Sequence, residues 1–494
     1  MALLAVAFAV YTVLVIAVGL IASRFTRAES EEYFLASRTL GPVLSALSSG
    51  ASGSSAWVTM GLVGLAFSSG VKAYWLIPGV LFGIAFNWFV IGKPMRNRAG
   101  ELGAVTIPDL ISMHFAERKP ILRLMSVGVI LSAMFLYVSA QMAAAGAVFE
   151  TVFEGVPYQA GVGIGVAIVL AYTVVGGFRA AVWTDMVQSS IMLLALVAMP
   201  IFILASGVIE GSVADALASS DPELATFMPS ETGVALIGFV LGSGALGVNF
   251  GYPGQPHVLV RLMALKDAKV IPVGAGIQIS WTVLIYAGAI TTGLLVRAAA
   301  GAGVDWATPI GTDAEGAPTG ELGMIVAAQE VLPGVLAAFV LAAVFSAMAS
   351  TADSQLIVAA SAVSSDFYER LFGLQGSRLS PWLNRGAVLL LGIGAGVQVL
   401  FDPLEIYKYV LTYGWAILGA SFGPQIALML LWKRASYAGC IAGMATGFVV
   451  TIVWQQLQDR GIIELPFYNL TVAFISAMVV NVVVSVATPR RLDP

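Results

Sequence analysis

The chain has 494 residues, of which 59% are hydrophobic and 11% are charged, and its mean hydropathy is +0.91. Soluble chains usually carry about 25% charged residues, so this composition excludes an ordinary soluble enzyme, a disordered protein and a nucleic-acid binder. The single cysteine excludes an internal disulfide, and the presence of only two histidines disfavours a histidine-based metal site.

Apolar runs long enough to cross a bilayer recur along the chain. A membrane helix needs roughly 20 apolar residues. In the first run the basic residues follow the apolar segment instead of preceding it, which favours a retained helix over a cleaved signal peptide. We expect about thirteen membrane helices, at 2–23, 42–69, 74–96, 121–149, 158–178, 183–206, 233–256, 271–298, 334–364, 385–401, 406–432, 437–456 and 466–487.

The lysines and arginines favour one orientation of these helices. If the N-terminus lies outside and the helices alternate, the outward loops hold only Lys72, Arg297, Lys408 and Arg460. The other twenty of the 24 basic residues, Arg261 among them, then fall in inward loops. Cytoplasmic loops carry such an excess. We therefore expect a multi-pass protein of the cell (inner) membrane, surrounded by lipid, with its N-terminus outside and its C-terminus in the cytoplasm.

Two spans contain stretches that disfavour a continuous helix. Residues 48–57 read SSGASGSSAW, and residues 242–254 form a second glycine-rich stretch. A glycine costs about 1 kcal/mol in a helix interior, and serine side chains compete for backbone hydrogen bonds. Unwound backbone at membrane depth could offer carbonyl oxygens to a cation. Close helix packing through small residues is the alternative interpretation.

The two interrupted spans lie five spans apart, which fits an inverted repeat of five helices each. The repeats would cover 42–206 and 233–432 within a single membrane domain, 1–494. Residues 1–41 would then form a peripheral helix and loop, and residues 437–494 two peripheral helices and a tail.

The span at 334–364 carries a polar face. Ala347, Ser350, Thr351 and Ser354 are spaced i, i+3, i+4 and i+7 and so share one side of a helix, with Asp353 at its border. Hard oxygen ligands suit a small hard cation. A carboxylate inside a span is a functional candidate, with a structural hydrogen bond as the alternative.

Several other polar or aromatic residues stand out in the apolar spans. Asp185 starts the sixth span, where it could satisfy the helix N-terminus or take part in ion binding. Trp57, Tyr137, Gln141, Asn249, Tyr252 and Trp415 lie within or at the ends of spans, and interfacial belts are the alternative role for the aromatic ones. Paired catalytic groups and nucleotide or hydrolase motifs are absent from the sequence, so we expect no enzyme.

A series of motifs in chain order resembles the solute:sodium symporter family, most of all its proline-transporting members. The motifs are Leu40-Gly41-Pro42, the Ser-Gly-Ala-Ser break with Trp57, Ile107-Pro108-Asp109, Gly176-Gly177-Phe178, Trp183-Thr184-Asp185, Gly254-Gln255-Pro256-His257, Ser350-Thr351 and Phe422-Gly423-Pro424. The resemblance implies an all-α membrane protein with a LeuT-type 5+5 inverted-repeat core. It also implies uptake of a small organic solute driven by Na+. The composition already excludes a nucleic-acid partner, and the oligomeric state is left open.

The resemblance also implies site residues. Sodium ligands would be backbone oxygens of Ala51, Ser54 and Ala347 and the hydroxyls of Ser350 and Thr351. A second sodium ion would involve Asp353, Ser354 and Asp185. Solute contacts would come from Ser55, Trp57, Tyr137, Gln141, Val248, Asn249, Tyr252 and Trp415.

Two residues depart from the pattern of the proline-transporting members. Gly53 stands where that pattern has an aspartate, and Val248 where it has a tryptophan. Because Asp353 adds a carboxylate elsewhere, we hypothesise that negative charge has moved from the second span to the ninth. L-Proline is the leading solute, and the alternatives are a compatible solute, pantothenate or a monocarboxylate. A channel or a sensor of transporter ancestry is the alternative of a different class.

Overall fold

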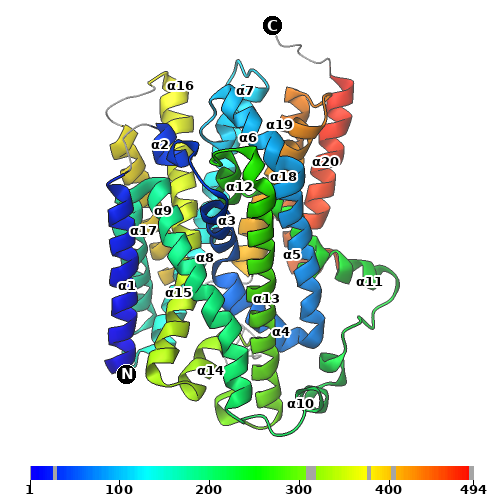
Figure 1. The fold of residues 1–494 in the computed structure, drawn as a ribbon. Helices are drawn as coiled ribbons and strands as arrows, with labels where there is room; N and C mark the ends of the chain where they lie inside the picture. Colours follow the sequence, from blue (N-terminus) through cyan, green and yellow to red (C-terminus); the bar gives the residue numbers. More distant parts are fainter. Residues whose placement is uncertain (1, 26–29, 308–318, 375–379, 402–407, 489–494) are drawn as a thin grey trace.

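The structure, a computed structural model, describes residues 2–25, 30–307, 319–374, 380–401 and 408–488 (Figure 1). In this part of the chain ten helical runs are long and apolar enough to cross a membrane. The start of the expected span at 406–432 and the tail beyond residue 488 lie outside it. The described residues are almost entirely helical, with one isolated backbone bridge between Leu40 and Leu265.

The helices of the first half are α1 (Ala2–Ser23), α2 (Ser30–Leu35), α3 (Pro42–Ala56), α4 (Leu62–Ser69), α5 (Leu76–Ala85), α6 (Gly92–Leu102), α7 (Ile107–His114), α8 (Ile121–Val152) and α9 (Tyr158–Ala205). Short segments join several of them: a 3-10 turn at Ala36–Arg38, π-helical turns at Trp57–Gly61 and Phe86–Ile91, and 3-10 turns at Gly70–Trp75.

The second half contains α10 (Val213–Ser220), α11 (Gly233–Val240), the 3-10 segment η6 (Leu246–Gly254), α12 (Pro256–Met263), α13 (Ile271–Gly301), α14 (Gly323–Val331), α15 (Gly334–Ser361), α16 (Arg370–Phe372), α17 (Ser380–Phe401), α18 (Ala416–Leu431), α19 (Tyr437–Asp459) and α20 (Asn469–Ala487). A π-helical segment, Ala362–Glu369, extends α15, and another, η10 (Lys408–Trp415), leads into α18. Three-residue 3-10 turns lie at Ala268–Val270 and Asp305–Ala307, and a four-residue one at Pro222–Ala225.

Local sequence explains where several helices begin. Pro42 occupies the first turn of α3, where its missing N–H costs nothing. Thr106 caps α7 by accepting a hydrogen bond from the Asp109 N–H, and Ser436 caps α19 by accepting one from the Gly439 N–H. These caps satisfy backbone donors that the first helical turn leaves without partners.

Two of the long runs each contain two of the expected spans. Pro42–Leu102 includes α3 to α6, and α9 alone covers 48 residues. Within α9 the direction changes at Gly177, whose backbone (φ +59°, ψ −161°) is unfavourable for other residues. A Cβ there would also lie 2.9 Å from the ring of Tyr33. The bend therefore needs glycine, and it replaces the loop expected between 178 and 183.

The seventh expected span ends later than the sequence suggests. After α11 the chain leaves the helix, continues through η6 and forms α12, every residue of which is buried. Arg261 is therefore inside the bundle, fully buried, and the expectation of an inward loop at this residue is wrong. The sequence-based prediction ends the span too early because the charge of Arg261 interrupts the apolar run. In the structure this charge is paired inside the bundle with Asp185.

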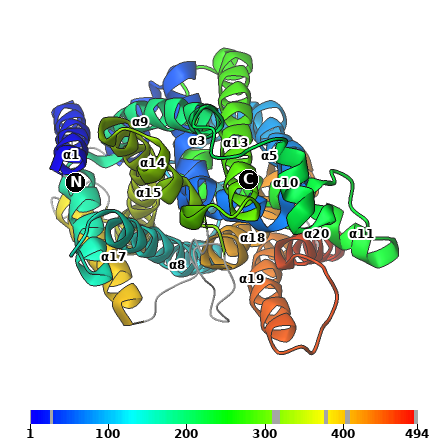
Figure 2. The same cartoon turned by 90° about the horizontal axis from the view of Figure 1, so that it is seen from below.

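The core lies around α15. In the most apolar stretch of the run that contains α15, 83% of the residues are buried inside the protein, against 28% in that of α1 and 33% in that of α19. Seen from below in Figure 2, α3, α15 and α18 occupy the middle, while α1, α17 and α19 lie at the periphery. In Figure 1 the beginning of α1 and the end of α20 lie at opposite ends of the bundle.

A buried ion-pair cluster ties the chain together at the end of the bundle where α7 lies (Figure 1). Arg123 of α8 donates to Asp109 of α7 (3.0 Å) and to Asp366 beyond α15 (2.9 Å). Arg370 contacts the other oxygen of Asp109 at 2.9 Å. Both carboxylates are fully buried, so the cluster holds three separate helices together only while its arginines remain in place.

Candidate ion and solute site

The site begins at the interruption in the second expected span. Ser55 has a positive φ (φ +54°, ψ −177°), which is rare for a residue with a side chain. The Ala56 N–H donates to Oε1 of Gln141 (2.9 Å), and the Trp57 N–H donates to Oγ of Ser55 (3.1 Å). The helix interruption expected in the 48–57 stretch is confirmed, and it falls near the end of that stretch.

Carbonyl groups just before the interruption face α15. The Ser350 hydroxyl donates to the carbonyl oxygens of Ala51 and Ala347, both at 3.3 Å. The Thr351 hydroxyl donates to the Ser52 carbonyl at 3.1 Å. All of these residues are buried, so oxygens from two helices meet without bulk water. Such a cluster of hydroxyl and carbonyl oxygens has the donor chemistry that a small hard cation prefers.

The structure thus brings four of the five residues of the predicted sodium site to the contact between α3 and α15. The fifth, Ser54, lies beside it on α3, where its hydroxyl donates to the Gly50 carbonyl (2.7 Å) and its own carbonyl accepts the Trp57 N–H. A carbonyl oxygen has two lone pairs and can take a second partner. The assignment of these five residues to sodium remains a prediction.

The predicted second ion position contains an arginine. Arg261 Nη2 lies 3.1 Å from Asp185 Oδ2 and 2.6 Å from the Ser354 hydroxyl. All three residues are buried at 0–1% exposure. Asp185 Oδ2 also accepts hydrogen bonds from Ser48 (2.6 Å) and Ser52 (3.2 Å). Two of the three residues predicted for a second sodium ion are therefore already bonded to a guanidinium group.

Asp353, the third of those residues, is oriented toward α9. Its Oδ2 accepts a hydrogen bond from the Tyr172 hydroxyl and its Oδ1 one from the Ser354 hydroxyl, both at 2.9 Å. Among the described residues, no lysine or arginine forms an ion pair with this carboxylate. The structural hydrogen bond that the sequence left open as the alternative role of Asp353 is therefore present.

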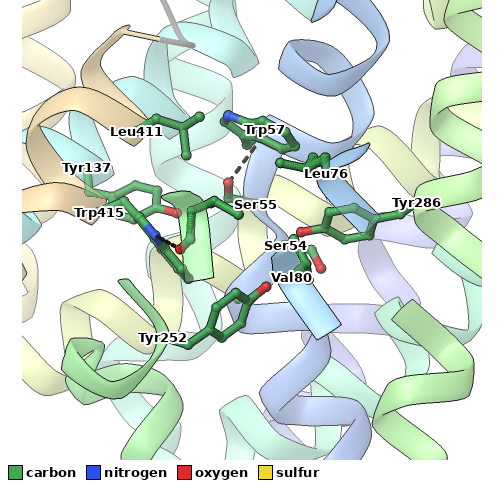
Figure 3. Close-up of a pocket in the computed structure, with 12 residues that line it drawn as sticks. Ser54, Ser55, Trp57, Leu76, Val80, Tyr137, Tyr252, Tyr286, Leu411 and Trp415 are labelled. Atoms are coloured by element: carbon green, nitrogen blue, oxygen red, sulfur yellow. Dashed lines mark hydrogen bonds between the residues drawn. The ribbon is translucent and has the colours of Figure 1, made fainter. Parts of the chain in front are cut away.

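A small cavity, of about 20 Å³, lies beside the interruption (Figure 3). Its lining residues come from α3 and the π-helical turn that follows it, and from α5, α8, α13, η6 and η10. They are Gly53, Ser54, Ser55, Trp57, Leu76, Val80, Tyr137, Val248, Tyr252, Tyr286, Leu411 and Trp415. No aspartate, glutamate, lysine, arginine or histidine is among them. The cavity is thus polar through hydroxyl groups and aromatic rings, without a full charge.

Six of the eight residues predicted to contact the solute line this cavity, and two do not. Gln141 is buried behind it, where it accepts the Ala56 N–H and so supports the helix interruption. Asn249 turns back to donate to the Leu246 carbonyl within η6. Tyr286, missed by the sequence reading, lines the cavity from α13, and a phenol in the middle of an apolar span was the signal for it. Leu76, Val80 and Leu411 gave no such signal.

Close packing of η6 against its neighbours fixes the aromatic wall. The Trp415 indole N–H donates to the Val248 carbonyl at 3.1 Å, and its ring meets Tyr252 edge-on with centroids 4.9 Å apart. A Cβ on Gly251 would overlap that indole, so only glycine permits this approach. On the other side Trp57 stacks on Tyr286. In Figure 3 the hydroxyls of the three tyrosines point toward the enclosed space.

Comparisons with known proteins match this architecture. A family model described as the sodium:solute symporter family covers residues 33–447. Among curated relatives, the sodium/proline symporter of Escherichia coli (strain K12) is 32% identical over 93% of this chain and 89% of its own length. The high-affinity proline transporter PutP of Bacillus subtilis (strain 168) is 33% identical, covering 86% of each chain. The osmoregulated proline transporter OpuE of the same organism is 31% identical over 98% of this chain and 95% of its own length.

A solved structure has the same fold. It is the substrate-bound, outward-open state of a Na+-coupled sialic acid symporter, with a TM-score of 0.79, 17% identity, and coverage of 100% of this chain and 99% of that one. The expected all-α LeuT-type fold is thereby confirmed, within an approximate helix count. From its motifs, its fold and these relatives, the chain belongs to the sodium:solute symporter family, a family of multi-pass membrane transporters, and Na+ is its coupling ion.

Proposed function

We propose that this protein imports L-proline together with Na+ by alternating access, as a transporter and not an enzyme. The observation that carries the proposal is the uncharged, tyrosine- and tryptophan-lined cavity directly beside the oxygen cluster of Ala51, Ala347 and Ser350. The curated relatives described above are named as proline transporters, which supports the choice of solute.

The sodium ion would bind between α3 and α15. Its ligands would be the carbonyl oxygens of Ala51, Ser54 and Ala347 and the hydroxyls of Ser350 and Thr351, with the Ser350 proton turned away from the carbonyls it now meets. An ion held by both helices stabilises the state in which they lie together. It can shift the conformational equilibrium only by its difference in affinity between the states. By linkage, Na+ and solute would raise each other's affinity by the same factor.

The solute would be compact and without net charge. The lining side chains leave only about 20 Å³ of free space between them, so they would move apart to admit the solute, and a compact solute requires the least movement. Leu76, Val80 and Leu411 would pack against an apolar ring, and the tyrosine and tryptophan faces would attract a positive amino group. The carboxylate would face the interrupted end of α3. A monocarboxylate would bring an uncompensated negative charge into this cavity, which makes it the weaker alternative.

Gly53 and Val248, the two departures from the proline-transporting pattern, both line the cavity. Gly53 contributes no side chain there, and an added Cβ would meet only Val258, at an ordinary 3.5 Å. The site therefore has room for a side chain at this position but does without the carboxylate. Val248 is smaller than a tryptophan, and the aromatic ring at this part of the cavity wall is that of Trp415, whose indole N–H donates to the Val248 carbonyl.

The arrangement in the membrane follows from the same proposal. Residues 42–206 and 233–432 would form the two repeats of the core within one transporter domain. The N-terminus would lie outside and the C-terminus in the cytoplasm of a bacterial inner membrane. Residues 1–41 and 437–494 would form the peripheral helices, in keeping with the low burial of α1 and α19.

The solute can be tested by its effect on thermal stability. The melting temperature of the purified protein would be followed with L-proline, glycine betaine, pantothenate and lactate, each in NaCl and in KCl. A ligand that binds only the folded state raises the melting temperature. We expect stabilisation by L-proline in NaCl that is lost in KCl. Stabilisation by pantothenate or lactate but not by proline would contradict the choice of solute.

A further inference from the structure

Arg261 donates hydrogen bonds to five residues in the centre of the protein. It lies on α12, is fully buried and donates to partners on three other elements: Ser48 (3.0 Å) and Ser52 (2.9 Å) on α3, Asp185 (3.1 Å) on α9, and Ser354 (2.6 Å) on α15. It also donates to the His257 carbonyl within α12. The guanidinium carbon is 4.9 Å from the centroid of the Phe178 ring. Nothing in this environment requires the arginine to reach water.

The pocket around Arg261 has the chemistry of a monovalent cation site. It combines one carboxylate with three hydroxyl oxygens, which are hard ligands for a hard cation. The two helices that flank the predicted sodium position, α3 and α15, both contribute to it through Ser52 and Ser354, whose hydroxyls are 2.9 Å apart. The pocket is therefore a second cation position next to the first, and the guanidinium group already fills it.

A free Na+ has little left to bind there. The Ser48, Ser52 and Ser354 oxygens and Asp185 Oδ2 all accept from Arg261 or from one another. Asp185 Oδ1 is the buried oxygen of this group without a hydrogen-bond partner among the described residues. A sodium ion needs several oxygen ligands, and this single oxygen is not enough. An ion bound to Asp185 Oδ1 would also be repelled by the neighbouring guanidinium charge, because the buried surroundings have a low dielectric constant.

We infer that Arg261 is the resident cation of this pocket, so that the transporter binds a single Na+ and admits a second free cation only when the arginine side chain is removed. The inference rests on the proposed sodium site between α3 and α15. It explains why Asp185 and Ser354, which resemble second-ion residues in the sequence, lie where no second ion is needed. Because the arginine cannot leave, this charge does not cross the membrane during the transport cycle.

The first test counts ions on the wild-type protein. Radioactive sodium binding to the purified, detergent-solubilised chain should saturate at one ion per chain. Saturation at two ions would overturn the inference, because a second ion would then bind with Arg261 in place. This measurement needs no solute and no variant. An error in the choice of proline would leave its result unchanged, so it can fail independently of the proposed function.

The second test removes the side chain. Arg261→Ala should lower the melting temperature in KCl, and millimolar guanidinium chloride should raise it again by occupying the vacated position. The same salt should lower or leave unchanged the melting temperature of the wild type, since guanidinium is otherwise a denaturant. The Hill coefficient for stabilisation by Na+ should rise from about 1 toward about 2. Arg261→Lys, which keeps the charge, should retain the one-ion behaviour.

Arg297→Ala is the matched control. Arg297 belongs to α13 and lies outside this pocket, with its guanidinium carbon 5.1 Å from the centroid of the Phe67 ring on α4. It should respond neither to guanidinium nor with a steeper sodium dependence. The inference is contradicted if Arg261→Ala shows neither guanidinium stabilisation nor a changed sodium dependence, or if Arg297→Ala shows both. If Arg261→Ala fails to fold, the wild-type ion count and the sodium dependence of Arg261→Lys decide the question. Binding of two sodium ions by either protein would refute the inference.

Discussion

Replacing Ser350 with alanine removes one hydroxyl from the proposed sodium site and leaves the backbone of α15 in place. The Ser350 Oγ is the atom that meets the carbonyl oxygens of both Ala51 and Ala347, each at 3.3 Å. A polar contact to a charged group contributes about 1.5–3 kcal/mol. Since about 1.4 kcal/mol corresponds to tenfold in affinity, the Na+ concentration for half-maximal activation should rise about 10- to 150-fold.

The assay is sodium-dependent solute uptake, or stabilisation of the purified protein by Na+, over a wide range of NaCl at constant ionic strength. Ser361→Ala is the control, because Ser361 lies on the same helix and its hydroxyl donates to the Val358 carbonyl of that helix. We expect a large shift for Ser350→Ala and none for Ser361→Ala. An unchanged half-activating concentration in Ser350→Ala would refute the placement of sodium between α3 and α15.

Three further predictions follow from packing and charge. Gly251→Ala should abolish stabilisation by the solute and cost about 1–3 kcal/mol of folding stability, because the added methyl group overpacks against Trp415. Gly53→Ala meets only ordinary contacts and should keep the folding stability and the solute stabilisation. Melting curves with and without solute distinguish the two variants. Arg123→Ala should cost about 3–5 kcal/mol because it leaves two buried carboxylates without their shared partner, while Ala at the exposed Arg118 should change the melting temperature little. Outside the membrane, the hydrogen bond from Lys72 lowers the pKa of Glu223, so the contact stabilises the fold above the ordinary carboxyl pKa of 4.5 and is lost as the pH falls through the lowered value. Glu223→Gln should remove this part of the acid sensitivity, and equal melting curves for both proteins at every pH would contradict it.

Regular features of the fold follow from the sequence because the physics behind them is local. Apolar runs of the right length predict membrane helices, and glycine with serine predicts where a helix is interrupted. The polar face of α15 is also readable, because Ser350, Thr351 and Ser354 recur with helical spacing. These patterns need no knowledge of which helix lies beside which.

The parts that the sequence did not reveal depend on contacts between distant segments. Arg261 reads as a loop residue because nothing near it in sequence offsets its charge, while its carboxylate partner Asp185 is 76 residues away. Gln141 reads as a solute ligand, yet it supports the interruption of α3 from 85 residues away. Tyr286 lines the cavity only because α13 packs against α3 and α4. Each requires the helix packing to be known first.

The most direct test of sodium-coupled proline import is uptake of labelled L-proline into proteoliposomes that contain the purified protein. With an inward Na+ gradient we expect accumulation above the external concentration, competed away by unlabelled proline and absent when K+ replaces Na+. Because solute and ion are linked, an inward proline gradient should also drive uptake of labelled Na+. Proline uptake that is equal in Na+ and K+, or no proline uptake by a protein that Na+ still stabilises, would contradict the account.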